Sequence, residues 1–260
     1  MNNEVYRSED ESYFVSMTDL LVGMLFVFII LLMAFALNLR DQQEQVTSAA
    51  DRLTSANLER TALLKNLQKS LQDNGVSVQI DTMNGVLRLP EAVLFSRGEY
   101  QLADRGKLTL QILAKELAAL LPRYACVPAL TGSRCPHEET AARLETILIE
   151  GHTDSTPAKG SQGTCLADNW SLSACRATAV FNQLTVSQNV LAAMENDHPL
   201  PNTGENEKLL GVSGYADRRP VSKDDMAENR RIDIRFIMST PDPEEARKFR
   251  DKFGTRAAPQ

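Results

Sequence analysis

A single carboxylate, Asp19, lies near the start of a stretch that is otherwise almost entirely apolar. The stretch, residues 16–37, reads SMTDLLVGMLFVFIILLMAFAL and contains no basic residue. Ser16-x-x-Asp19 has the form of a capping box, in which a carboxylate at a helix N-terminus satisfies free backbone N–H groups. If the helix begins at Phe14 or earlier, Asp19 lies inside it, where an ionisable group is costly and usually marks an ion path. Both interpretations fit the sequence, and we favour the ion path.

A second group of reactive side chains, His152, Asp154 and Ser155, lies within the segment LIEGHTDS. Adjacent residues of a strand point to opposite faces, so this nearness in sequence does not create a catalytic triad. The chain has three histidines, and none has the H-E-x-x-H spacing or a similar metal-binding spacing. We therefore expect no enzyme, no metal and no cofactor, and His152 is interpreted as a packing or orienting residue.

The composition is that of a foldable protein without a nucleic-acid-binding surface. The chain has 260 residues, of which 43% are hydrophobic, and its net charge is −6. This length allows one ordinary domain with additional segments. The negative charge offers nothing to attract phosphates, so we expect no nucleic-acid partner.

The apolar stretch predicts one transmembrane helix over residues 14–39, after an N-terminal tail over residues 1–13. Every residue from Leu20 to Leu37 is apolar or glycine, which is long enough to cross a hydrocarbon core of ~30 Å. Ala34-Phe35-Ala36 resembles a signal-peptide cleavage site, but the preceding segment is acidic, whereas a signal peptide begins with a basic region. The distribution of Lys and Arg is too even to orient the helix.

The four cysteines give a clue to topology, because all of them follow the apolar helix. An even number of cysteines on one side of a membrane fits disulfides in an oxidising compartment. This places the N-terminus in the cytoplasm and the rest of the chain in the periplasm. Four buried, reduced thiols are the alternative, and the sequence does not give the connectivity of Cys126, Cys135, Cys165 and Cys175.

Residues 40–75 predict a helical linker, since they contain neither Pro nor Gly before the final Asn74-Gly75. A set of mostly apolar positions follows the 4-3-4-3 spacing of a helix that pairs with a second copy of itself. The alternative is a solvated helical spacer. The residues of this predicted dimer seam are Val46, Ala50, Leu53, Asn57, Arg60, Leu64, Leu67 and Leu71.

Residues 76–239 predict an α/β sandwich, in which a mixed sheet carries helices on one face. Apolar and polar residues alternate on both sides of Asn84-Gly85, which is typical of a tight hairpin with positive φ at both turn residues. Helical and strand patterns then alternate along the chain, with two long loops at residues 124–145 and 155–169 that are functional or pinned by disulfides. Residues 240–260 are a charged C-terminal tail.

The domain carries a compound motif that resembles the OmpA-like peptidoglycan-binding family. The segments LIEGHTDS, DNWSLSACRATAV and GYADRRPVSKDDMAENRRIDIRFI contain G-H-T-D, N-x-x-L-S-x-x-R-A, G-Y-x-x-x-x-P and N-R-R, in the order of that family. The resemblance covers roughly Val76 to Met238. It implies a domain that binds the cell wall.

The resemblance also implies a ligand and its contacts. The stem peptide of the cell wall carries diaminopimelate, whose ammonium would pair with Asp154 and whose carboxylate would bind the guanidinium of Arg176 in a bidentate fork. The alternative is that Asp154 and Arg176 form a salt bridge with each other. By the same resemblance, the rim of the site includes Asn169, Leu172, Thr153 and Arg231.

A second resemblance concerns the layout of the whole chain. A short tail, one helix with an Asp near its cytoplasmic end, a helical linker and an OmpA-like domain are the layout of MotB-type stator subunits. The apolar run is more similar to the B subunits of Zorya anti-phage defence systems than to flagellar MotB. Flagellar MotB generally has a basic tail and Ala-Asp, whereas this chain has an acidic tail and Thr18-Asp19.

This resemblance implies that Asp19 carries the coupling ion of an inner-membrane motor complex. Two copies of this chain would be surrounded by five copies of a multi-helix A subunit, similar to MotA or ZorA. A flagellar stator and a passive cell-wall tether without ion conduction remain the alternatives. The sequence does not distinguish proton from sodium, nor does it identify the activating trigger or the downstream effector.

Overall fold

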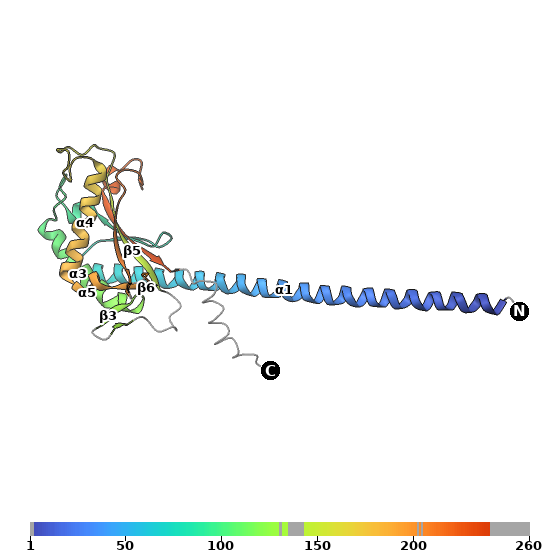
Figure 1. The fold of residues 1–260 in the computed structure, drawn as a ribbon. Helices are drawn as coiled ribbons and strands as arrows, with labels where there is room; N and C mark the ends of the chain where they lie inside the picture. Colours follow the sequence, from blue (N-terminus) through green and yellow to red (C-terminus); the bar gives the residue numbers. More distant parts are fainter. Residues whose placement is uncertain (1–2, 130–131, 135–142, 202, 204, 240–260) are drawn as a thin grey trace. The chain divides into compact units, whose positions relative to one another are not determined.

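The computed structural model describes residues 3–129, 132–134, 143–201, 203 and 205–239 (Figure 1). Contacts divide the chain into two units, with the boundary in the first helix between Asp51 and Arg52.

Among the described residues, the first unit comprises the N-terminal part of helix α1 (Asn3–Asp73). Its residues Met17–Glu44 form a segment long and apolar enough to cross a membrane, and the most apolar 18 residues of that segment have a mean hydropathy of 3.1. The helix begins at Asn3, so Asp19 lies about four turns inside it rather than at its N-terminus. The capping-box interpretation of Asp19 is therefore wrong.

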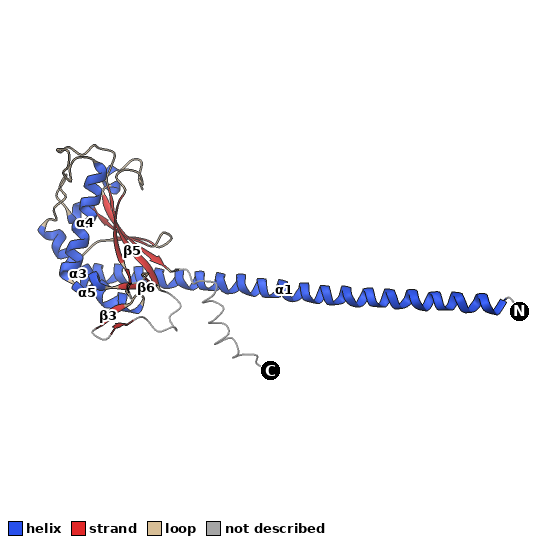
Figure 2. Cartoon of the chain, in the orientation of Figure 1, coloured by secondary structure: helices blue, strands red, loops and turns tan. Residues whose placement is uncertain are grey.

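The second unit contains a mixed five-stranded sheet with the strand order β1-β2-β9-β5-β8. Figure 2 draws the strands in red and labels β5. Strands β5 and β8 run parallel, and the other neighbouring pairs are antiparallel. The strands are β1 (Gln79–Asp81), β2 (Val86–Pro90), β5 (Leu144–His152), β8 (Leu210–Gly214) and β9 (Arg231–Met238). All five correspond to strands that the sequence predicts.

Helix α4 (Asn169–Ser187) packs against β5 and β8, and α3 (Asp104–Leu120) packs beside α4 (Figure 1). The short helix α5 (Asn189–Ala193) follows α4. Helix α3 ends where the 3₁₀ turn η1 (Leu121–Arg123) begins, since Pro122 lacks the N–H that an α-helix requires. The predicted α/β fold, a mixed sheet with packed helices, is confirmed.

The C-terminal turns of α1 belong to the core of this second unit. Leu63, Leu64, Leu67 and Leu71 are at most 1% exposed and join the same apolar cluster as the sheet and α3. Three of these leucines were predicted to pair with a second copy of the chain, and they pack within their own chain instead. Of the predicted seam, Val46 and Leu53 are exposed, at 70% and 49%.

The predicted hairpin forms, although its turn is longer than the two residues expected. Strand β1 ends at Asp81 and β2 begins at Val86. Only Gly85 of the Asn84-Gly85 pair has a positive φ, of 69°. Asn84 donates from its side chain and its backbone to the Asp81 carboxylate, at 2.8 and 3.1 Å. An Asx-type turn therefore replaces the tight turn.

Several short elements were not predicted. Two small antiparallel ladders pair β3 (Val127–Ala129) with β4 (Gly132–Arg134), and β6 (Glu195–Pro199) with β7 (Asn206–Lys208). Short helices α2 (Glu91–Leu94) and α6 (Met226–Asn229) also occur. The predicted C-terminal tail lies outside the described residues.

The disulfide expectation is confirmed for Cys165 and Cys175, which are bonded to each other. Cys126 is also disulfide-bonded, and Cys135 lies outside the described residues. Reduced thiols, the alternative that the sequence allowed, are therefore excluded for the cysteines that the structure describes.

Candidate functional site

Two glycines let helix α4 approach the C-terminal ends of β5 and β8. A Cβ atom at Gly151 would lie 2.0 Å from the backbone oxygen of Ser173, and one at Gly214 would lie 2.8 Å from the backbone nitrogen of Ala174. Neither position has room for a larger residue. The close packing brings the start of α4 to the residues that follow β5, where the predicted site begins.

Asp154, two residues beyond β5, accepts hydrogen bonds on both carboxylate oxygens. Arg230 donates from Nη1 to Oδ2 at 2.6 Å, and the backbone N–H of Thr156 donates to Oδ1 at 2.9 Å. Burial alone would raise the pKa of Asp154, but these hydrogen bonds outweigh it and lower the pKa below its usual value. Asp154 is therefore a charged carboxylate with a fixed orientation.

Arg176, the predicted carboxylate ligand, faces away from solvent and is 2% exposed. Its guanidinium donates to Glu91 and, at 2.8 Å, to the backbone oxygen of Glu99. Burial lowers the pKa of Arg176, while the nearby Glu91 carboxylate opposes that shift. Arg176 therefore binds Glu91 and forms no hydrogen bond with the carboxylate of Asp154 within the described part of the chain.

Arg230 connects these two parts of the site. Its Nε lies 2.7 Å from Glu91, while its Nη1 binds Asp154. The acids and bases thus alternate in the order Asp154, Arg230, Glu91, Arg176. The direct salt bridge between Asp154 and Arg176, which the sequence left open, is replaced by this four-membered chain.

The loop after Asp154 is fixed to the start of α4 at two further points. Asn169 donates from Nδ2 to the backbone oxygen of Asp154 at 3.2 Å, and its Oδ1 accepts from the backbone N–H of Ala158 at 2.9 Å. The disulfide between Cys165 and Cys175 ties the end of the same loop to α4. The long loop predicted at residues 155–169 is therefore pinned.

A pocket of ≈ 250 Å³ opens beside Asp154. Of the six residues predicted to bind peptidoglycan, only Thr153 and Asp154 line it. Sequence reasoning missed Asp217 and Lys223, although both lie within the quoted segment GYADRRPVSKDD. The lining residues are Thr153, Asp154, Ser155, Asp217, Pro220, Ser222, Lys223, Met226 and Asn229. The pocket thus presents two acids and one lysine to a ligand.

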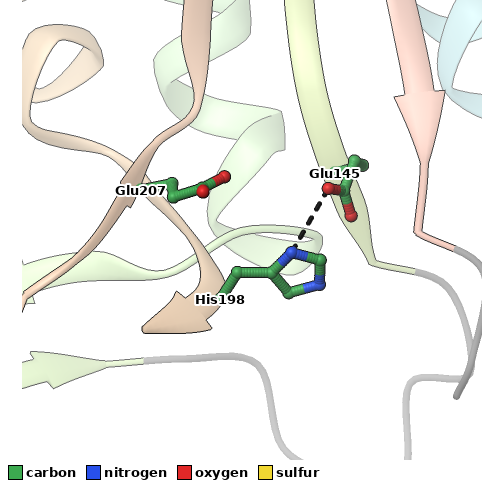
Figure 3. A group of neighbouring side chains, drawn as sticks. All are labelled: Glu145, His198 and Glu207. Atoms are coloured by element: carbon green, nitrogen blue, oxygen red, sulfur yellow. Dashed lines mark ion pairs between the residues drawn. The ribbon is translucent and has the colours of Figure 1, made fainter. Parts of the chain in front are cut away.

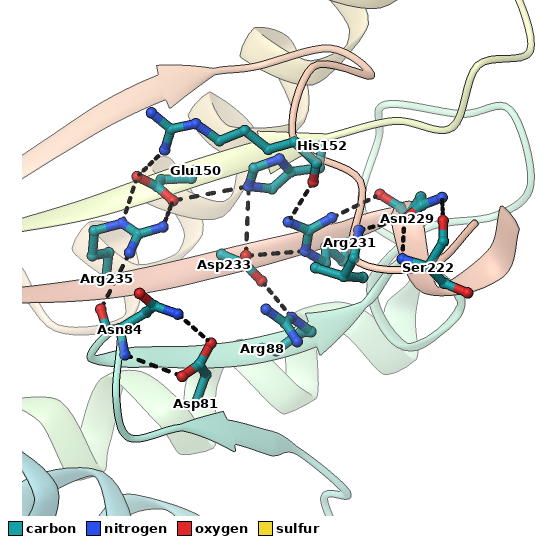
Figure 4. Close-up of polar contacts among 12 residues, drawn as sticks. Asp81, Asn84, Arg88, Glu150, His152, Ser222, Asn229, Arg231, Asp233 and Arg235 are labelled. Carbon is teal, nitrogen blue, oxygen red and sulfur yellow. Dashed lines mark hydrogen bonds and ion pairs between the residues drawn. The ribbon is translucent and has the colours of Figure 1, made fainter. Parts of the chain in front are cut away.

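The other two predicted residues, Leu172 and Arg231, are buried and do not line the pocket. Leu172 is 7% exposed and Arg231 is 4% exposed. Arg231 donates from Nε to Asp233 at 3.0 Å and from Nη2 to the backbone oxygen of Arg219 at 3.1 Å (Figure 4). It therefore belongs to a buried polar network that extends away from the pocket.

The site lies within a region of the chain that matches a known protein family. Residues 133–233, which include the end of β5, α4 and the loop of the pocket, match the model of the OmpA family. The chain contains an OmpA family domain. The pocket beside Asp154 and the pinned loop both lie within this OmpA domain.

Similarity to individual proteins extends beyond the OmpA domain. The Zorya protein ZorB of Escherichia coli is 23% identical over 241 residues, which cover 89% of this chain and 90% of that protein. The uncharacterized protein YtxE of Bacillus subtilis is 29% identical over 180 residues, which cover 66% of this chain and 57% of that protein.

Solved structures with similarity to the chain include a MotB-like protein from Desulfovibrio vulgaris and a cell wall anchor of the T6SS from Pseudomonas aeruginosa. The first is 20% identical with a TM-score of 0.43, and the match covers 76% of this chain and 96% of that chain. The second is 19% identical with a TM-score of 0.42, and the match covers 68% and 97%.

Proposed function

We propose that this chain is the peptidoglycan-anchored subunit of a proton-driven, stator-type motor complex of the inner membrane, used in anti-phage defence. The observation that carries the proposal is the position of Asp19, inside a continuous helix and at the start of a membrane-length apolar segment. The similarity to ZorB over most of both chains supports the defence role. A passive tether needs no carboxylate at this position.

Asp19 is the ion carrier in this proposal. A charged carboxylate is costly in the low-dielectric interior of a membrane, so protonation from one side and release to the other couples ion flow to movement. The partner is a multi-helix A subunit, with five copies around two copies of this chain. Because Leu64, Leu67 and Leu71 are already buried, pairing of the two copies is left to the part of α1 that holds Val46 and Leu53.

The OmpA domain anchors the complex to the wall in the periplasm. Asp154 is proposed to bind the ammonium of diaminopimelate in the stem peptide. Arg176 is the contact for the ligand's carboxylate by resemblance, but it would first have to release Glu91. Lys223 is exposed and already lines the pocket, so the pocket geometry favours Lys223 as the contact, with Arg176 as a positioning residue.

Binding to purified peptidoglycan sacculi tests the anchor. We expect Asp154→Asn to reduce sedimentation of the full-length, detergent-solubilised chain with sacculi by about tenfold or more, since a charge-assisted contact is lost. Asp104→Asn is the matched control, because Asp104 is exposed and pairs with Lys107 away from the pocket. Lys223→Ala and Arg176→Lys separate the two candidate carboxylate contacts. Wild-type sedimentation of Asp154→Asn would contradict the anchor site.

Phage plating tests the motor. Asp19→Asn should abolish protection while membrane insertion and sacculus binding remain, because the amide cannot exchange a proton. Asp41→Asn on the same helix, beyond the apolar run, removes an equal charge and should leave protection intact. Full protection by Asp19→Asn would leave only the passive tether. Loss of swimming without any effect on plating would favour the flagellar stator.

A further inference from the structure

Three potential metal ligands converge where the β6-β7 ladder meets the start of β5 (Figure 3). They are Glu145 of β5, His198 of β6 and Glu207 of β7, and their donor atoms all lie within 4.8 Å of one another. His198 Nδ1 lies 3.3 Å from Glu145 Oε1. Glu207 and His198 are exposed and Glu145 is partly buried, so an ion can enter from solvent.

One buried side chain positions all three ligands. Asn196 is 2% exposed and donates from Nδ2 to the backbone oxygen of Glu145 at 3.1 Å and to Oε2 of Glu207 at 3.3 Å. Its Oδ1 accepts from the backbone N–H of His198 at 2.9 Å. In protein metal sites, the ligands are typically oriented by hydrogen bonds from neighbouring groups.

The second nitrogen of His198 also faces a group that suits a metal ligand. Oδ1 of Asp197 is buried without a hydrogen-bond partner and lies 3.9 Å from His198 Nε2. The other oxygen, Oδ2, lies 2.5 Å from Nη1 of Arg143. A histidine that binds a metal through one nitrogen usually donates the N–H of the other to a carboxylate. Asp197 is placed to accept that hydrogen bond.

The two carboxylates near His198 are not neutralised by a lysine or arginine side chain of the described residues. Arg143 pairs with Asp197, but no Lys or Arg side chain of the described residues pairs with Glu145 or Glu207. Within the described residues, the two carboxylates therefore lie beside one imidazole and form no ion pair with a lysine or arginine. A divalent ion would neutralise both.

We propose that Glu145, His198 and Glu207 form a zinc site, with Nδ1 of His198 and one oxygen of each carboxylate as ligands. An imidazole with two carboxylates suits Zn²⁺ better than Mg²⁺ or Ca²⁺, which prefer oxygen ligands alone. Three protein ligands leave a fourth, tetrahedral position for water. The ion joins three strands, so it fixes the β6-β7 ladder to strand β5 of the five-stranded sheet. The site lies apart from the pocket at Asp154, and it does not depend on the proposed function.

Zinc titration of the full-length chain tests this site. The tag-free protein, in detergent and treated with EDTA, is titrated with ZnCl₂ in a calorimeter. We expect one Zn²⁺ per chain, and about 100-fold weaker binding by His198→Ala, which removes one of three ligands. Asp197→Asn should weaken binding by about tenfold, since it alters the group that orients His198. Glu205→Gln, which removes an exposed acid from the same hairpin, should bind within about twofold of the wild type.

X-ray absorption of the zinc complex identifies the ligands. The expected first shell contains one imidazole nitrogen and oxygens, with no sulfur. Equal zinc affinity of the wild type and His198→Ala, or a first shell without imidazole, would overturn the proposal. Equal affinity of the wild type for MgCl₂ and ZnCl₂ would also count against it. Because His198 is 50% exposed at its side chain, we expect the fold of His198→Ala to be intact, and circular dichroism checks this.

Discussion

The two ends of strand β5 carry the same combination of side chains in opposite surroundings. At its C-terminal end, Glu150 and His152 lie beside Asp233 of β9, and all three are buried (Figure 4). At its N-terminal end, Glu145 lies near His198 and Glu207 at the surface (Figure 3). We call these the inner cluster and the outer cluster. Each combines one imidazole with two carboxylates, yet only the outer cluster is suited to a metal.

Arginines account for the difference. In the inner cluster, Arg235 binds both oxygens of Glu150 at 2.8 Å, while Asp233 accepts from Arg88 at 3.1 Å and from Arg231 at 3.0 Å. These guanidiniums neutralise both carboxylates, so the cluster has no uncompensated negative charge that would attract a metal ion. Near the outer cluster, Arg143 pairs with Asp197, and within the described residues neither Glu145 nor Glu207 forms an ion pair with an arginine.

The pKa of Glu150 reflects this compensation. Burial would raise it, but the neighbouring His152 and the hydrogen bonds from Arg235 outweigh burial and lower the pKa to about 2. Glu150 therefore stays ionised inside the domain. The comparison shows that the surrounding cations, and not the donor set alone, determine whether such a cluster stabilises the fold or binds an ion.

The largest expected effect comes from removing a cation from the inner cluster. Arg235→Met leaves Glu150 buried without its main partner, and loss of one partner of a buried pair typically costs about 3–5 kcal/mol. The free energy of unfolding can be measured in urea by the fluorescence of Trp170, the single tryptophan of the chain.

Arg143→Met is the corresponding change in the outer cluster. Arg143 and Asp197 are 26% and 21% exposed, so we expect a loss of only about 1 kcal/mol, near the range of solvent-exposed pairs. Equal losses of unfolding free energy in Arg235→Met and Arg143→Met would show that the arginine of the inner cluster is no more important for stability than the arginine beside the outer cluster.

Much of the fold could be predicted from local pattern. Helices α3 and α4 show helical spacing of apolar residues, and β5 and β9 show the runs expected of buried strands. The leucines at the end of α1 were assigned wrongly for a physical reason. A 4-3-4-3 spacing defines one apolar stripe, and the same stripe can cover a second helix or the core of its own domain.

The site was predictable only in part. Asp154 was identified from the resemblance to the OmpA-like family, whereas its partner Arg230 was passed over in favour of Arg231. Neighbouring residues at the start of a strand point to opposite sides, and the sequence does not give the phase of the alternation. The outer cluster was missed because its ligands come from three separate strands, two of which, β6 and β7, have no alternating apolar pattern.

A further effect, on the pH dependence of stability, comes from the buried His152 of the inner cluster. Burial lowers the pKa of His152, and the nearby Arg231 adds to that shift, although Glu150 and Asp233 oppose it. The unfolded chain therefore binds a proton more readily than the folded chain, so stability falls as pH decreases below about 6.5. Between pH 7.5 and pH 5.5 this single group should lower the free energy of unfolding by at most about 1 kcal/mol, a limit set by the pKa of an unfolded histidine.

His152→Phe removes the titrating group and keeps a ring that can stack on Tyr215, whose ring centroid lies 5.5 Å from that of His152. Both ring nitrogens of His152 are buried without a hydrogen-bond partner, so the substitution breaks no hydrogen bond. We expect urea unfolding of this variant to lose up to about 1 kcal/mol less than the wild type between the two pH values. If His152→Phe shows the full wild-type loss between the two pH values, His152 is not the group that makes the folded domain sensitive to acid.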